Sequence, residues 1–144
     1  MTATMMTKEN PVSNLAQHAE EFYTLLLSDF AAAERKYISD DFEWVNPLPE
    51  IVPFGGTYKG VPELMRYLGE LNAAIEMKPL HITQFVADGL TIAAIGVEQD
   101  TIVKKTGKRY TMPFVHVLHF NADGKINCVR EYNDTTQMLE AFAD

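Results

Sequence analysis

The fold is decided by residues 109–133, which read RYTMPFVHVLHFNADGKINCVREYN. Both halves of this stretch read as extended runs, in which successive side chains point to opposite faces of a strand. Between the halves, Asp123-Gly124 is a turn signal. The stretch therefore predicts an antiparallel hairpin with strands Arg109–Phe120 and Lys125–Asn133.

Two earlier extended runs, Leu80–Ala87 and Leu90–Lys104, are each followed by a turn signal. Together with the hairpin they predict a four-stranded antiparallel meander. The longest strands need a bend, and Gly96 is a suitable position for it. A sheet that bends in this way has a concave face.

The rest of the chain reads mainly as helices. Apolar residues at spacings of three and four predict helices over Val12–Phe30, Ala31–Ile38 and Gly60–Met77. A brief strand is predicted at Phe42–Asn46, and Asp134–Gln137 resembles a capping box that starts a last helical turn. This order predicts an α+β fold in which helices cover one face of a bent sheet and leave a pocket between them.

Residues 47–60 hold three prolines and three glycines and predict a long irregular loop. Its apolar side chains allow two interpretations. The loop is either a lid over the mouth of a cavity or an ordinary loop pinned onto the core, and the residues alone favour neither.

Composition limits the partners and the location. The 144 residues suit one domain, assigned to residues 10–144 after an expected flexible tail at residues 1–9. A formal net charge of −8 disfavours nucleic acid and anionic membranes as partners. Cys128 is the only cysteine, so no intramolecular disulfide can form. No run resembles a signal peptide or a membrane span, and a cytoplasmic protein is expected.

Alternation along Arg109–Phe120 places His116 on the same face as Met112 and Phe114. His119 falls on the opposite face, so the two imidazoles cannot hold one ion together. No other ligand set with metal-site spacing is present in the sequence, and no metal is expected.

The last predicted strand carries Glu131, and its orientation is open from the pattern alone. If the face that holds Val129 points inward, Glu131 lies among apolar walls, where burial raises the pKa of a carboxyl toward neutral and suits a general acid or base. If not, Glu131 lies at the exposed edge of the sheet, where most charged residues are found.

A second candidate pair is Glu98 and Asp100, which share a strand face by spacing. They read either as paired carboxylates or as a solvent-facing stripe, and rank below Glu131. The basic residues around Thr106-Gly107 read as a solvated hairpin tip. Gly55-Gly56 lacks the strand-to-helix setting and the lysine of a phosphate loop, so no nucleotide or other cofactor is expected.

Several short motifs follow one another in a characteristic order: Phe22-Tyr23, Asp41-Phe42-Glu43-Trp44-Val45-Asn46-Pro47, Gly56-Thr57-Tyr58-Lys59-Gly60, Asp123-Gly124-Lys125-Ile126 and Arg130-Glu131-Tyr132-Asn133-Asp134. In these the chain resembles the SnoaL-like branch of the nuclear transport factor 2 superfamily, over Val12–Phe142. The resemblance implies a cone-shaped barrel. A strongly bent antiparallel sheet would be covered on its concave face by the N-terminal and third helices, around a pocket.

The resemblance also orients the strands, because family members keep their reactive groups on the faces where His116 and Glu131 fall. It implies Glu131 as the acid–base carboxylate and His116 as its partner. The expected substrate-contact residues are Tyr23, Trp44, Asn46, Phe54, Met112, Phe114, Val129 and Asn133.

Two better-known branches of the superfamily match less well. Ketosteroid isomerase has its general base where this chain has Asn46, which cannot take a proton. Limonene epoxide hydrolase needs an inward arginine and a second aspartate near the positions of Val97 and Gln99.

The leading hypothesis is a cofactor-free, isomerase- or cyclase-type enzyme that abstracts a proton next to a carbonyl of a small hydrophobic metabolite. The alternatives are a non-catalytic ligand-binding or dimerisation domain of the same fold and, more weakly, a diverged epoxide hydrolase. A homodimer is expected from the superfamily.

Overall fold

The computed structural model describes residues 11–144, with side chains from residue 14 onward. The expected tail at residues 1–9 lies outside the described residues. Along the chain the elements are α1 (Pro11–Ser28), α2 (Phe30–Tyr37), β1 (Ile38–Asn46), β2 (Gly56–Lys59), α3 (Gly60–Ala74), β3 (Ile75–Glu76), β4 (His81–Asp88), β5 (Thr91–Val103), β6 (Arg109–Phe120), β7 (Ile126–Asn133) and α4 (Thr136–Phe142).

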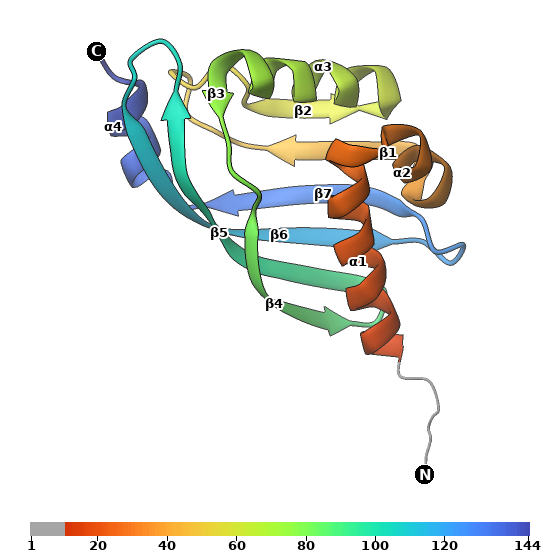
Figure 1. The fold of residues 1–144 in the computed structure, drawn as a ribbon. Helices are drawn as coiled ribbons and strands as arrows, with labels where there is room; N and C mark the ends of the chain where they lie inside the picture. The colour runs from red at the N-terminus through yellow and green to blue at the C-terminus, as the bar shows by residue number, and fades with distance from the viewer. Residues whose placement is uncertain (1–10) are drawn as a thin grey trace.

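The strands form one strongly curved sheet (Figure 1). Its order is β2-β1-β7-β6-β5-β3, and β4 also pairs with β5. The predicted antiparallel meander from β4 to β7 is confirmed. The expectation of a purely antiparallel sheet is wrong, because β1 pairs in parallel with β7 and places Trp44 opposite Val129. These two strands come from distant parts of the chain, so no turn fixes their relative direction and only the closing of the sheet sets it.

Two bulges mark where the pairing of β5 changes, one in β4 opposite Gly96 and one in β5 itself. At Gly96 the pairing with β4 shifts register, and a Cβ at this position would collide with the carbonyl oxygen of His81. This is the position at which the sequence predicts a bend. A second register shift, against β6, lies between Glu98 and Thr101, where Asp100 has a φ of 51°. Such bulges increase strand twist and bending.

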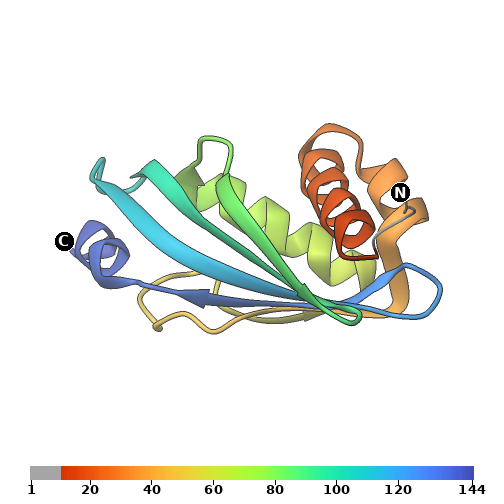
Figure 2. The same cartoon turned by 90° about the horizontal axis from the view of Figure 1, so that it is seen from below.

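Helices α1 and α3 lie on the concave side of the sheet (Figure 2). Helix α1 buries Ala19, Phe22 and Leu26, the spacing from which the sequence predicts its inner face. The carboxylate of Asp29 accepts a hydrogen bond from the backbone N–H of Ala32 and so caps α2. Among the described helices, none is both long and apolar enough to span a membrane.

The proline- and glycine-rich segment 47–60 differs from the predicted irregular loop at its end and agrees with one of the two interpretations of its apolar side chains. Its last residues form the short edge strand β2, which pairs with a β1 that is longer than the predicted brief strand. The side chains of Val52 and Phe54 are buried, and Tyr58 donates a hydrogen bond to the carbonyl oxygen of Phe54. The segment is therefore pinned onto the core, in agreement with the second of the two interpretations.

The capping-box prediction for the last helix is wrong. The carboxylate of Asp134 accepts from both the backbone N–H and the hydroxyl of Thr136, while the N-cap position belongs to Thr135. The side-chain oxygen of Gln137 accepts from the backbone N–H of Thr111. The glutamine thus ties α4 to β6, and a tertiary contact replaces the local one.

Candidate functional site

A cavity of about 410 Å³ lies between α1, α3 and the concave face of the sheet. Most of its wall is apolar. The lining residues that are exposed to solvent, Thr24, Leu27 and Pro79, place its opening between the end of α1 and the segment before β4. The hydrogen-bonding or charged side chains deepest in the wall are Tyr23, Asn46, Tyr67, Glu98, His116 and Glu131.

Strand pairing brings the two predicted reactive residues together. His116 of β6 and Glu131 of β7 are direct partners across the sheet, and both side chains are buried. The face that holds Val129 points inward. The imidazole Nε2 lies 3.3 Å from Oε1 of Glu131. The open question about the orientation of Glu131 is thereby answered.

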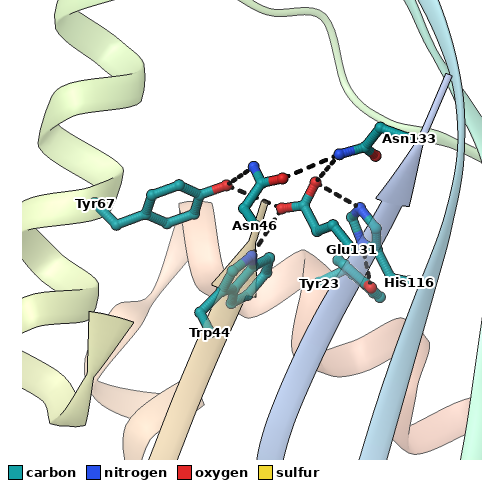
Figure 3. Close-up of polar contacts among 7 residues, drawn as sticks. All are labelled: Tyr23, Trp44, Asn46, Tyr67, His116, Glu131 and Asn133. Atoms are coloured by element: carbon teal, nitrogen blue, oxygen red, sulfur yellow. Dashed lines mark hydrogen bonds and ion pairs between the residues drawn. The ribbon is translucent and has the colours of Figure 1, made fainter. Parts of the chain in front are cut away.

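Four groups surround the carboxylate of Glu131 (Figure 3). The indole Nε1 of Trp44 and the hydroxyl of Tyr67 donate to Oε2 at 2.7 and 2.9 Å. The amide of Asn133 donates to Oε1 at 3.3 Å, beside His116. A carboxylate with this many donors is stabilised in its ionised form.

Asn133 also donates to Asn46, which lies behind the groups that contact the carboxylate. The amide of Asn133 donates to the side-chain oxygen of Asn46 at 3.0 Å, and the amide of Asn46 donates to the hydroxyl of Tyr67 at 2.9 Å. The hydroxyl of Tyr67 thus accepts a hydrogen bond from Asn46 and donates one to Glu131 (Figure 3).

The other nitrogen of the imidazole contacts helix α1. The hydroxyl of Tyr23 lies 2.8 Å from Nδ1 of His116, and the ring of Phe114 stacks on the imidazole with a centroid separation of 4.3 Å. Tyr23, His116 and Glu131 therefore form a continuous hydrogen-bonded row from a helix across two strands. Burial, and then the charge of Glu131, raise the pKa of Tyr23, which keeps its hydroxyl protonated.

The expected direction of the pKa shift of Glu131 is wrong. Burial alone raises the pKa of this carboxyl, but the charge of His116 and the hydrogen bonds from His116, Trp44 and Tyr67 outweigh it, so the pKa lies below its ordinary value. The expectation from sequence considered only the apolar surroundings of Glu131 and did not include the hydrogen-bond donors around it. Glu131 is consequently ionised at neutral pH.

The paired-carboxylate interpretation of Glu98 and Asp100 is also wrong. The bulge in β5 turns the two side chains apart, so that Asp100 is half-exposed and pairs with Lys78 and Arg109. Glu98 is buried in the cavity wall and accepts a hydrogen bond from the hydroxyl of Thr101. Burial raises the pKa of Glu98.

The expected substrate-contact residues divide into two groups. Those that line the cavity are Tyr23, Trp44, Asn46, Phe54 and Met112. Phe114, Val129 and Asn133 lie outside that lining, and two of them instead support His116 and Glu131. Their roles toward a substrate stay predictions.

Tyr67 is the residue that sequence reasoning missed. It appeared only as one apolar position on the inner face of the third helix, whereas its hydroxyl contacts Glu131 and its ring lies in the cavity wall. The available signal was a polar-tipped aromatic residue on a face otherwise made of aliphatic side chains. Within residues 11–144, no group of three His, Cys, Asp or Glu side chains is placed to hold a metal ion.

Comparison with known families identifies the fold. The model of the SnoaL-like domain matches residues 19–129, well over half of the chain. The chain belongs to the SnoaL-like domain family. The match to this SnoaL-like domain includes His116 and ends two residues before Glu131.

Solved structures agree with this assignment. A nuclear transport factor 2-like protein from Burkholderia xenovorans is 22% identical, with a TM-score of 0.80 over 92% of this chain and 98% of that one. A protein from Mesorhizobium loti, provisionally named a SnoaL-like polyketide cyclase, is 26% identical, with a TM-score of 0.64 over 82% and 97%. TerC, crystallised with polyporic acid, is 22% identical, with a TM-score of 0.74 over 89% and 97%. A search of curated proteins gave no significant match.

Proposed function

We propose that this SnoaL-like domain is an acid–base enzyme that moves a proton next to a carbonyl group of a small, largely apolar metabolite, without the help of a cofactor. The observation that carries the proposal is the row Tyr23–His116–Glu131, which ends in an apolar cavity. The names of two related structures support the same class of reaction. One is the Mesorhizobium loti protein provisionally named a cyclase, and the other is a Bacillus subtilis protein provisionally named an isomerase.

The imidazole and the carboxylate would accept the proton as one unit. They lie 3.3 Å apart in a buried site, so a proton that reaches the imidazole lies directly beside the carboxylate. When the C–H bond next to the carbonyl breaks, its electron pair forms a double bond to the carbonyl carbon, the C=O π pair moves onto the oxygen as an enolate, and the proton goes to the His116–Glu131 pair. In a substrate with a carbon–carbon double bond next to the reacting carbon, the C=O bond re-forms as the pair returns the proton to the far carbon of that double bond, which completes an isomerisation.

The negative charge that develops on the carbonyl oxygen of the substrate needs a hydrogen-bond donor close to that oxygen. The hydroxyl of Tyr23 lines the cavity and stays protonated, so it is suited to donate to an enolate oxygen. Asn46 is also an expected substrate-contact residue, but its amide already donates to the hydroxyl of Tyr67. The aromatic faces of Trp44 and Phe54 would contact the apolar body of the substrate.

Exchange of ketone hydrogens for deuterium tests the proposal. Aryl methyl ketones are incubated with the protein in ²H₂O, and loss of the methyl proton signal is followed by NMR. General acid–base assistance is worth about 100- to 10,000-fold, so Glu131→Gln should slow the catalysed exchange by that order. Glu140→Gln, at an exposed residue of α4, is the matched control. Equal exchange by the wild type and Glu131→Gln would remove this residue from the mechanism.

A non-catalytic ligand-binding domain is the second candidate, and one observation favours it. The donors around Glu131 lower its pKa and so weaken it as a base. Ketones that bind in the cavity but exchange no faster than in buffer would support this candidate. A diverged epoxide hydrolase draws less support, since no arginine is among the described residues that line the cavity.

A further inference from the structure

The cavity contains a second carboxyl group that the proposed proton transfer does not use. Glu98 lies on β5 opposite Met112 of β6, and its side chain is only 7% exposed. Like Glu131 it belongs to the cavity wall. Burying a carboxyl group in apolar surroundings is costly unless its oxygens are paired or its charge is removed.

The two carboxyl groups differ in the number of their partners. Around Glu131, hydrogen bonds or ion pairs reach both oxygens, whereas among the described residues the hydrogen bond from Thr101 reaches only Oε2 of Glu98, at 2.8 Å. The hydroxyl of Tyr110 favours the charged form of Glu98, yet it makes no hydrogen bond of ordinary geometry and is itself buried without a partner. A carboxyl with one donor and a free second oxygen is best accommodated with a proton on that oxygen.

A role confined to the bulge of β5 would explain only half of this arrangement. The contact from Thr101 holds the bulge, and it needs a single acceptor oxygen. The hydrogen bond from Thr101 engages only Oε2, and Glu98 belongs to the cavity wall, where a protonated carboxyl is a hydrogen-bond donor.

We propose that Glu98 donates a hydrogen bond to an oxygen of the ligand, from the part of the cavity wall that lies four residues along β6 from His116 and Glu131. The inference rests on the proposed function, because it assumes an apolar ligand whose carbonyl lies at the His116–Glu131 pair. It adds that the ligand carries a second acceptor oxygen and an apolar body between the two.

The register of the sheet gives the spacing of the two ends. Glu98 is opposite Met112, and Glu131 is opposite His116, four residues further along β6. At about 3.3 Å per residue, the two rows are about 13 Å apart along the strand. This is a spacing of the backbone, and an elongated two-ring molecule with an oxygen at each end is of similar length.

Two matched probes test the inference. One is biphenyl with an acetyl group at each end, and the other carries an isopropyl group in place of one acetyl, so that only the second acceptor oxygen differs. Trp44 is the only tryptophan and lies in the cavity wall, so its fluorescence reports binding. We expect the diketone to bind about 3- to 10-fold more tightly, the value of one net hydrogen bond.

Two variants of Glu98 separate donation from packing. Glu98→Gln keeps a donor and should keep the preference for the diketone, whereas Glu98→Met has similar length without a donor and should lose it. In the wild type the preference should fall as pH rises and Glu98 loses its proton, and in Glu98→Gln it should stay constant. The other titratable groups around Glu98 are Tyr67, Tyr110, His116 and Glu131, and both proteins share them.

The possible outcomes distinguish the two proposals. Equal affinity for both probes, or a preference that Glu98→Met retains, overturns the role of Glu98 and leaves the proposed function standing. Failure of the wild type to bind either probe overturns both. If Glu98→Met does not fold, the comparison of pH profiles between the wild type and Glu98→Gln decides, and identical profiles overturn the inference.

Discussion

At the scale of single residues, two buried glutamates in one cavity have opposite properties. Glu131 has donors on both oxygens and a lowered pKa, whereas Glu98 has a single hydroxyl donor of ordinary geometry and a raised pKa. The difference comes from the charge of His116 beside Glu131 and from the number of hydrogen-bond donors, since both carboxyls are buried. Pairs of groups whose environments move their pKa values apart are typical of acid–base sites.

The lowered pKa of Glu131 predicts a loss of stability in acid. A carboxyl whose pKa is depressed in the folded state stabilises the protein above the unfolded value, about 4.3, and this contribution disappears as pH falls through the folded value. We expect Glu131→Gln to be about 1–3 kcal/mol less stable than the wild type at neutral pH, with a gap that narrows in acid. Urea unfolding across this pH range measures it, and a gap independent of pH would contradict the assignment.

The raised pKa of Glu98 predicts the opposite sign. Below the unfolded pKa both states are protonated; above it the unfolded chain ionises first, so the wild type loses stability as pH rises toward the folded value. Glu98→Gln carries no such ionisation and should gain stability relative to the wild type between acidic and neutral pH. The same urea series tests this prediction. A free energy of unfolding that falls for Glu98→Gln relative to the wild type as pH rises would contradict it.

At the scale of elements, β5 sets the geometry of the site. The absence of a Cβ at Gly96 lets Phe114 lie close to the strand, because a Cβ there would come within 2.9 Å of the edge of that ring. Phe114 in turn stacks on His116. A glycine in β5 therefore influences the position of the imidazole through one aromatic ring.

We predict that Gly96→Ala destabilises the protein, by about 1–3 kcal/mol, through collisions with the backbone of β4 and with Phe114. Gly69→Ala is the matched control, because Gly69 lies in α3 with nothing within 4 Å of its Cβ position. Alanine is the better helix former, and this control should gain up to about 1 kcal/mol. Thermal unfolding of both variants checks the prediction, and equal stabilities would contradict it.

At the scale of the whole molecule, the helices leave one face of the sheet without a helix among the described residues (Figure 2). Ile95, Val115 and Tyr132 are neighbours across β5, β6 and β7 on that face. Tyr132 is 53% exposed and the other two are partly exposed. An apolar row in the middle of an uncovered sheet is typical of an association surface.

The expected homodimer would use this face. Val115→Lys places a charge at its centre and should convert a dimer into a monomer, as measured by sedimentation velocity. Met65→Lys, at an exposed residue of α3, is the control and should leave the assembly state unchanged. A wild-type protein that sediments as a monomer would contradict the expectation.

The sequence by itself determined the helices, the four meander strands and the family. The helices and strands follow from local periodicity and turn signals, as in Arg109–Phe120, where the strand has the predicted bounds, and the family follows from the resemblance carried by the ordered motifs. It also selected His116 and Glu131 as the reactive pair, through alternation and the resemblance. Local patterns report on neighbours in the chain, and they carry this information without any tertiary contact.

Only the tertiary structure decided how the charges behave. The pairing of β6 with β7 brings His116 to Glu131, the parallel pairing of β1 with β7 brings Trp44, and helix packing adds Tyr67. Groups from three elements thus lower a pKa that burial alone raises. The bulge that turns Glu98 inward and Asp100 outward is likewise set by strand register. Ionisation depends on what surrounds a group in space, and those neighbours come from segments that the chain brings together only on folding.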